Sequence, residues 1–338
     1  MFNQIHIKMK IKTKTRLWML AIPFIAFSLT SCDAEEDPPV EVNEAELLIE
    51  WLESPTSPAA DYGNSGLAIK SAEATNTLLG AGKVYLIDIR SDVDFGKGHI
   101  DGAVNLGAGA VAAHIDETDL SAYDEIHIIC YSGQSASWLT CLLRLDGYDN
   151  VFSMKFGMCA WADTFATSWP GAISSEYSTF FVSDATAKGD EGDLPDLGTG
   201  FETAEEIFDA QLADAYTDGF GGAAISAADV YANPDDYYII NYWPEAEYLD
   251  PGHIDGAMQY DDLKLDVSLK TLPTDKTIVV YCYTGQNSAR LATYLKVLGY
   301  DAKSLKFGAN AMIYDDMTKS KWSDAAIMNY DYWTPSGK

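Results

Sequence analysis

Five short segments occur twice in this chain of 338 residues, in the same order and at an almost constant spacing. The histidine of the segment Gly-His-Ile-Asp-Gly-Ala recurs after 154 residues, as His99 and His253. A cysteine followed by Tyr, Ser or Thr, Gly and Gln recurs after 152 residues, as Cys130 and Cys282. A repeat of this length is the size of a whole domain, so the chain is expected to contain two copies of one fold.

Each copy alternates apolar strands with amphipathic helices. In the first copy, residues 84–89 and 126–130 are short apolar runs, typical of strands buried on both faces of a parallel sheet. Residues 134–145 carry apolar side chains at helical spacing, and residues 288–298 do so in the second copy. The predicted fold class is therefore α/β, with two domains that each contain a parallel sheet flanked by helices.

Helices are also expected ahead of each copy, over residues 44–52 and 203–215. Asn43 is the expected N-cap of the first of these helices. Ser71 and Ser226 are the expected N-caps of the helical segments that follow in the two copies. We divide the folded part of the chain into a first domain at 43–175, a linker at 176–200, a second domain at 201–325 and a C-terminal tail at 326–338.

The start of the chain is typical of an exported protein. Residues 1–31 hold five basic residues and no acidic ones, and an apolar run from Leu17 to Leu29 is too short to cross a bilayer comfortably. The run leads to Leu-Thr-Ser-Cys32, which resembles the lipobox of bacterial lipoproteins. We expect a lipoprotein signal peptide at 1–31, lipidation at Cys32 and an acidic tether at 32–42. An ordinary signal peptide or membrane anchor is the alternative.

This N-terminus predicts a protein of the bacterial cell envelope, anchored by lipid to a membrane on its periplasmic side or at the cell surface. The formal net charge of −29 excludes nucleic acid as an expected partner, because an acidic surface repels phosphates. Cysteines and histidines do not cluster at the spacing of a zinc site, so we expect no metal and no cofactor.

In each copy an apolar strand ends in a cysteine, which a short glycine-containing loop joins to a helix. This order places the sulfur of Cys130 or Cys282 at a helix N-terminus, where unpaired backbone N–H groups favour anions. A thiolate there is expected to have a lowered pKa and to be a good nucleophile. A structural cysteine in the core is the alternative, and the duplication of the whole segment favours the nucleophile.

The order of Leu-Ile-Asp-Ile-Arg, Gly-His-Ile-Asp-Gly-Ala, Cys-Tyr-Ser-Gly-Gln and Gly-Tyr resembles the rhodanese (thiosulfate sulfurtransferase) family over about residues 62–170 and 203–320. The resemblance implies that a cysteine takes a sulfane sulfur from a thiosulfate or persulfide donor, holds it as a persulfide and passes it to a thiophilic acceptor. Cys282 is the first choice for the catalytic residue, because the C-terminal repeat carries the activity in many tandem members. Cys130 is the second.

The resemblance also implies that the five residues after each cysteine form the loop that binds the persulfide. These residues are Tyr131, Ser132, Gly133, Gln134 and Ser135 in the first copy, and Tyr283, Thr284, Gly285, Gln286 and Asn287 in the second. Many family members have arginine at the last of these positions, where this chain has serine or asparagine. We expect such a neutral loop to favour a less charged sulfur donor.

Two departures between the copies affect this interpretation. The first copy keeps Asp88 and Arg90, whereas the second has Asn241 and Trp243, so packing is expected to replace an ion pair there. The related dual-specificity phosphatases need arginine six residues after the cysteine to hold phosphate. Alanine and serine occupy those positions here, which argues against that activity.

Other histidines and cysteines are expected to be structural. His99 and His253 resemble family residues that order a turn by hydrogen bonds, and Cys141 is expected in the helix core. A disulfide between Cys130 and Cys159 is left open. The predicted function is a sulfurtransferase whose partners are small sulfur donors and acceptors, and no protein partner can be identified. A non-catalytic rhodanese-fold module, for binding or redox sensing, is the alternative.

Overall fold

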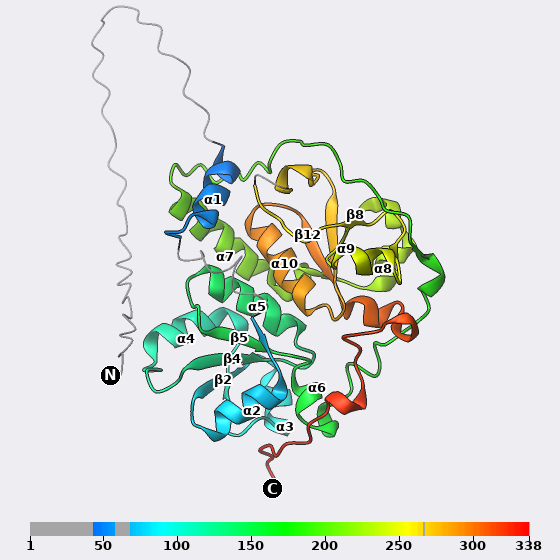
Figure 1. Ribbon diagram of the computed structural model, residues 1–338. Helices are drawn as coiled ribbons and strands as arrows, with labels where there is room; N and C mark the ends of the chain where they lie inside the picture. The colour runs from blue at the N-terminus through cyan, green and yellow to red at the C-terminus, as the bar shows by residue number, and fades with distance from the viewer. Residues whose placement is uncertain (1–42, 58–67, 266–267, 338) are drawn as a thin grey trace, which may run out of the picture. The chain divides into compact units, whose positions relative to one another are not determined.

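Each repeat folds around a sheet of five parallel strands in the computed structural model, which describes residues 43–57, 68–265 and 268–337 (Figure 1). The first sheet has the order β1-β5-β4-β2-β3 and the second the order β7-β12-β11-β8-β10, so the two repeats share one topology. The strands of the first sheet are β1 (Ile69–Lys70), β2 (Val84–Asp88), β3 (Val104–Asn105), β4 (Glu125–Ile129) and β5 (Val151–Met154). Those of the second are β7 (Ala224–Ile225), β8 (Tyr237–Asn241), β10 (Met258–Gln259), β11 (Thr277–Tyr281) and β12 (Ala302–Leu305).

The predicted α/β class and the two parallel sheets are confirmed. The central strands β2, β4, β8 and β11 are almost wholly buried, as expected for apolar runs covered on both faces. Strand β4 ends at Ile129 and strand β11 at Tyr281, one residue before the cysteine of each repeat. The fold therefore brings both cysteines to the carboxyl end of a central strand.

The helices begin where the cap residues predicted. Asn43 caps α1 (Glu44–Glu53), Ser71 caps α2 (Ala72–Gly80) and Ser226 caps α8 (Ala227–Ala232), each by accepting a backbone N–H with its side chain. The other α-helices are α3 (Asp92–Lys97), α4 (Val111–Glu117), α5 (Gln134–Leu145), α6 (Met158–Trp161), α7 (Ala204–Gly222), α9 (Glu245–Leu249) and α10 (Gln286–Val297). Helix α10 starts two residues earlier than expected, directly after Gly285.

The two repeats belong to one structural unit, because the chain from Val42 to Lys338 does not divide further. Helices α5 and α10 lie side by side between the two sheets, α7 packs against both of them, and α1 packs against α7 (Figure 1). One core of buried residues runs through all four helices and includes Leu48, Leu142, Leu212 and Leu295. Separate cores cover the outer face of each sheet. The repeats therefore share their largest core rather than each closing its own.

Each repeat is also covered by a segment that comes from the end of the other. After the first repeat, β6 (Phe181–Val182) pairs with β9 (His253–Ile254) of the second in an antiparallel arrangement. After the second repeat, Trp333 forms an antiparallel bridge with His99 of the first. The segment predicted as a linker therefore pairs with the second repeat, and the segment predicted as a tail pairs with the first.

Within the described residues, no helix is both long enough and apolar enough to span a membrane. The predicted signal peptide, the lipidation site Cys32 and the acidic tether at 32–42 lie outside the described residues.

Candidate active site

The cysteine loop of repeat one, residues 130–135, turns sharply at Gly133 and leads directly into α5. Gly133 adopts a φ of 88°, a left-handed conformation that glycine reaches without strain. Its backbone N–H lies 3.1 Å from the sulfur of Cys130, and the N–H of Ala136 lies 3.4 Å from the same atom. Amides from both the loop and the first turn of the helix therefore donate to this sulfur.

The cysteine loop of repeat two, residues 282–287, has the same shape. Gly285 adopts a φ of 75° before α10 begins, and the N–H of Ser288 lies 3.3 Å from the sulfur of Cys282. The Ser288 hydroxyl lies 3.6 Å from this sulfur and 2.8 Å from the hydroxyl of Ser304 on β12. Repeat two thus adds a side-chain hydroxyl at the position that alanine occupies in repeat one.

The expectation of a lowered thiol pKa is wrong for Cys130. Burial raises the pKa of the Cys130 thiol, because it disfavours the charged thiolate. Hydrogen bonds from the Ser135 side chain and from loop amides oppose this effect and lower the pKa without overcoming it. The helix N-terminus supplies the expected donors. The sulfur belongs to a residue that is only 4% exposed, and the effect of this burial on the pKa is larger than that of the donors.

The remaining side chains of the first loop point to different partners. Ser135 bonds to Cys130, and Ser132 accepts a hydrogen bond from the side chain of Gln134 at 3.0 Å. The ring of Tyr131 lies 5.0 Å from the guanidinium carbon of Arg90, at cation–π distance. Only Ser135 among these side chains is therefore placed to act on the sulfur directly.

In the second loop, the side chains form hydrogen bonds or stack with residues of the loop and its surroundings. Thr284 accepts the backbone N–H of Gln286 at 3.4 Å, and Asn287 accepts a hydrogen bond from Nε of Arg290 at 3.1 Å. Tyr283 stacks on Trp243 with ring centroids 4.5 Å apart. Since Asn287 is occupied with Arg290, Ser288 is the residue that brings a polar side chain to Cys282.

The end of the neighbouring strand supports each loop in a different way. In repeat one, Asp88 and Arg90 form an ion pair of 2.6 Å whose side chains are both 1% exposed. In repeat two, Asn241 accepts the backbone N–H of Trp243 at 3.0 Å and donates to the hydroxyl of Tyr281 at 2.8 Å. The expected replacement of an ion pair by packing is confirmed.

The two histidines of the repeated Gly-His segment order a turn. Nδ1 of His99 lies 2.9 Å from the Phe95 carbonyl oxygen, and Nδ1 of His253 lies 2.8 Å from that of Tyr248. Each imidazole also stacks on the ring of the residue that it bonds, with centroids 3.6 Å apart. Burial lowers the pKa of His253, which keeps its imidazole neutral near neutral pH. These contacts agree with the expected structural role.

The other two cysteines lie in the cores. Cys141 is buried in the core shared by the repeats, as expected. Cys159 is also buried, and its thiol donates to the Phe165 carbonyl oxygen at 3.3 Å. Burial raises the pKa of the Cys159 thiol as well. Within the described residues, no disulfide joins Cys130 to Cys159.

Three contacts at the loops were not anticipated from the sequence. The side chains of Gln134 and Gln286 reach out of their own loops and bond to the opposite repeat. The indole N–H of Trp169 donates to the Ser132 carbonyl oxygen at 3.2 Å, and its ring packs between Phe156 and Phe307. The repetition of Gly-Gln and Lys-Phe-Gly was visible in the sequence, but it carried no information on which repeat each side chain contacts.

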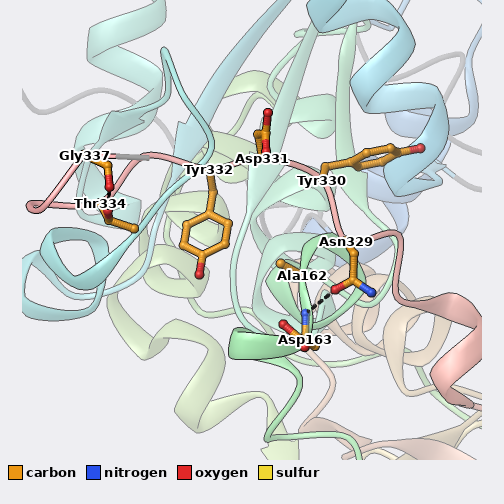
Figure 2. Close-up of a pocket in the computed structure, with 8 residues that line it drawn as sticks. All are labelled: Ala162, Asp163, Asn329, Tyr330, Asp331, Tyr332, Thr334 and Gly337. Atoms are coloured by element: carbon orange, nitrogen blue, oxygen red, sulfur yellow. Dashed lines mark hydrogen bonds between the residues drawn. The ribbon is translucent and has the colours of Figure 1, made fainter.

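A pocket lies where the C-terminal segment passes α6 of repeat one (Figure 2). The backbone N–H of Asp163 donates to the side chain of Asn329 at 3.1 Å beside it. The residues that line it are Ala162, Asp163, Asn329, Tyr330, Asp331, Tyr332, Thr334 and Gly337, so it includes neither loop cysteine. In the described part of the chain, no three His, Cys, Asp or Glu residues are grouped as metal ligands.

Comparison with known proteins identifies a matching family and relatives of this chain. A model of the rhodanese-like domain matches residues 71–164 and 226–314. The thiosulfate sulfurtransferase GlpE of Shewanella oneidensis is 36% identical over 81 residues, which cover 24% of this chain and 78% of that protein.

Solved structures of related proteins also match. A rhodanese-related protein from Thermoplasma volcanium matches over 27% of this chain and 91% of its own, with 26% identity and a TM-score of 0.24. A thiosulfate sulfurtransferase from Pseudomonas aeruginosa matches over 79% of this chain and 48% of its own, with 18% identity and a TM-score of 0.27.

The two stretches matched by the domain model contain both cysteine loops and together make up more than half of the chain. The match to GlpE, which covers most of that protein's length, points to the same family. Together they support sulfurtransferase activity at the level of the family. The chain belongs to the rhodanese-like family and contains its domain twice.

Proposed function

We propose that this protein transfers a sulfane sulfur from a donor to a thiophilic acceptor through a cysteine persulfide. The observation that carries the proposal is the pair of loops whose amides donate to the sulfurs of Cys130 and Cys282. Such donors stabilise negative charge on sulfur, whether it is on the thiolate or on the persulfide that replaces it.

The chemistry requires only the cysteine and its two substrates. The thiolate attacks the outer sulfur of the donor, a new S–S bond forms on the cysteine, and the donor's own S–S bond breaks. With thiosulfate as donor, sulfite leaves with the electron pair of that bond. The acceptor then attacks the terminal sulfur of the persulfide, and the cysteine leaves as a thiolate. No cofactor or metal takes part in this sequence.

Both cysteines are candidates, with Cys282 the first choice and Cys130 the second. Burial raises the pKa of the Cys130 thiol, which reduces its thiolate fraction near neutral pH. The Cys282 thiol donates to the Ser288 hydroxyl at 3.6 Å, and the backbone N–H of Ser288 donates to its sulfur at 3.3 Å. The choice of Cys282 first follows the family resemblance, in which the C-terminal repeat carries the activity in many tandem members.

The direct test is intact mass spectrometry after incubation with thiosulfate or with a low-molecular-weight persulfide. We expect a mass gain of one sulfur atom, reversed by cyanide or a thiol and greatly reduced in Cys282→Ser. The double variant Cys130→Ser/Cys282→Ser should gain none. If the wild-type protein gains no sulfur from any donor, the proposed activity is wrong.

The donor is proposed to carry less charge than thiosulfate. Ser135 and Asn287 are neutral at the position where many relatives have arginine, and Asn287 bonds to Arg290. A panel of donors at equal concentration should therefore give faster persulfide formation with a monoanionic or neutral persulfide than with thiosulfate. Thiosulfate as the best donor of the panel would contradict this proposal.

A non-catalytic module for binding or redox sensing is the second candidate. One observation favours it, since the cysteine residues of both loops are only 4% exposed. The same mass measurement separates the two functions, because a binding module would take up no sulfur at either cysteine under any donor.

Attachment to a membrane by lipid at Cys32 is part of the same proposal and depends on the sequence alone. Mass spectrometry of the protein expressed in a bacterial host should find the lipid on Cys32, and Cys32→Ser should move the protein from the membrane fraction to the soluble fraction. Recovery of unmodified Cys32 in a protein retaining residues 1–31 would contradict the lipoprotein assignment.

A further inference from the structure

The first side chain of each helix that follows a cysteine loop crosses into the opposite repeat. Oε1 of Gln286 accepts the backbone N–H of Phe156 at 3.0 Å, and Oε1 of Gln134 accepts the backbone N–H of Phe307 at 2.7 Å. Gln134 is 2% exposed and Gln286 is fully buried. A buried amide is retained only where its polar atoms are used, so this exchange is a specific feature of the interface.

The residues that receive these bonds have an unusual backbone. Phe156 and Phe307 adopt φ angles of 62° and 61°, a left-handed conformation that is rare for a side chain of this size. A residue held in this region persists only where its surroundings fix it. The glutamine of the opposite repeat provides one such constraint, because it bonds the N–H of the same residue.

The turn that contains each of these phenylalanines packs closely against the backbone of the cysteine in its own repeat. A Cβ atom at Gly157 would collide with the Cys130 carbonyl oxygen, and one at Gly308 would collide with that of Cys282. The amide after Gly157, that of Met158, donates to the Cys130 carbonyl at 2.8 Å. The turn therefore fixes the backbone from which the reactive sulfur projects.

The same arrangement is present in repeat two, where the N–H of Ala309 donates to the Cys282 carbonyl at 2.9 Å. The two loops also approach each other so closely that a Cβ atom at Gly133 would collide with the Gln286 amide, and one at Gly285 with that of Gln134. Glycine is thus required at both positions for its left-handed φ and for this approach.

The exchange is unequal in one respect. Nε2 of Gln286 donates to the Gly133 carbonyl oxygen at 3.3 Å, and Gly133 is the residue whose own N–H bonds to Cys130. Nε2 of Gln134 instead donates to Ser132 in its own loop. Gln286 therefore bonds to both the cysteine loop and the phenylalanine turn of the opposite repeat, whereas Gln134 bonds only to the phenylalanine turn.

We propose that Gln286 is a positioning residue for Cys130 and that Gln134 is a positioning residue for Cys282, so that each sulfur site is completed by the other repeat. The proposal rests on the proposed function in taking the cysteine loops as the active sites. Neither glutamine touches a reacting atom in this scheme. Each acts by fixing the amides and the turn that surround the opposite cysteine.

The test measures the alkylation rate of each cysteine separately in the full chain. Gln286→Met and Gln134→Met keep the length of the side chain and remove its hydrogen bonds. Iodoacetamide is applied over a series of pH values, and the peptides that contain Cys130 and Cys282 are quantified by mass spectrometry. Alkylation needs no sulfur donor, so failure of the proposed activity would leave this measurement intact.

We expect a crossed pattern. Gln286→Met should shift the pH profile of Cys130 to higher pH and slow its alkylation near neutral pH by about threefold to tenfold, because thiolate stabilisation is lost. Cys282 should slow less than Cys130 does. Gln134→Met should slow Cys282 in the same way, with the smaller effect of the two, and should slow it more than it slows Cys130, whose loop loses only the bond to Ser132.

Controls separate positioning from general loosening. Thr293→Val removes another buried hydrogen bond of α10, from its hydroxyl to the Ala289 carbonyl, and should leave both pH profiles unchanged. Gln286→Glu keeps an acceptor for the Phe156 N–H and should restore part of the Cys130 rate. If Gln286→Met does not fold, Gln286→Glu takes its place in the test. A larger shift at the cysteine of the same repeat, or equal shifts at both cysteines, would overturn the proposal.

Discussion

The two repeats support the same loop with different chemistry. In repeat one, Asp88 accepts the backbone N–H of Arg90 at 3.0 Å and also neutralises the buried guanidinium. In repeat two, Asn241 accepts the backbone N–H of Trp243 at the same distance, and the indole stacks on Tyr283 where Arg90 approaches the ring of Tyr131. What both repeats need is an acceptor at the strand end and a flat group beside the tyrosine.

A third position changes together with this pair. Tyr281 of β11 occupies the place of Ile129 in β4, and its hydroxyl accepts hydrogen bonds from Asn241 at 2.8 Å and from the Ile254 backbone at 3.2 Å. In repeat one, Arg90 itself donates to the Gly98 carbonyl in this region. A charged network and a neutral one are therefore two solutions to the same packing problem.

The largest effect is expected from breaking the ion pair of repeat one. Asp88→Ala leaves the Arg90 guanidinium buried without its counter-charge and should lower the free energy of unfolding by about 3–5 kcal/mol. Chemical denaturation of the purified protein measures this loss.

Transplanting the neutral network provides the matched comparison. The triple variant Asp88→Asn/Arg90→Trp/Ile129→Tyr copies repeat two into repeat one and should lose less stability than Asp88→Ala alone. A triple variant that is as unstable as the single one would show that the two networks are not interchangeable.

A smaller effect is expected in the pH dependence of Cys130. Burial raises its thiol pKa, and the thiolate is the reactive form, so its alkylation rate should rise by about tenfold per pH unit below that pKa. The rise should continue beyond pH 8.5, where an ordinary thiol begins to level off at about its own pKa. Rates measured by peptide mass spectrometry, in native and in denatured protein, provide the comparison.

Removing the Ser135 side-chain bond should move this profile further. Ser135→Ala deletes a contact that lowers the pKa of Cys130, so the profile should shift to still higher pH. A native profile that levels off below that of the denatured protein would contradict the dominance of burial.

The smallest effect is expected at the serine that distinguishes Cys282. Ser288→Ala removes the hydroxyl that accepts the hydrogen bond of the Cys282 thiol and should speed sulfur uptake by Cys282 about fivefold, because the thiol loses the acceptor that holds its proton; this corresponds to a net hydrogen-bond energy of about 1 kcal/mol. Single-turnover persulfide formation, followed by mass spectrometry, measures this rate.

Ser304→Ala is the matched control, because it breaks the bond between the two serines and leaves the Ser288 hydroxyl beside the sulfur. It should change the rate at Cys282 less than Ser288→Ala does. Equal rates in the wild type and in Ser288→Ala would mean that the additional hydroxyl does not distinguish the two sites.

Features that depend on neighbouring residues were predictable from the sequence. The duplication predicted two domains, the apolar runs predicted the strands that end just before Cys130 and Cys282, and Asn43, Ser71 and Ser226 marked helix starts. These features follow from local rules, because strand periodicity and helix capping act over a few residues.

The contacts of Gln134 and Gln286 could not be predicted from local rules of this kind. Each glutamine bonds a residue more than a hundred positions away, in a repeat with the same topology as its own. Since both repeats contain the same Gly-Gln and Lys-Phe-Gly segments, no local pattern distinguishes a bond within a repeat from a bond between repeats.

The residue pattern was sufficient to predict the duplicated α/β fold and a cysteine at the start of a helix in each copy. It could not predict that the helices of both copies share one core, that exchanged glutamines tie the two loops, or that burial raises the Cys130 pKa. Desolvation and long-range contacts depend on every segment packed around a group, whereas helix and strand formation depend mainly on the residues next to it.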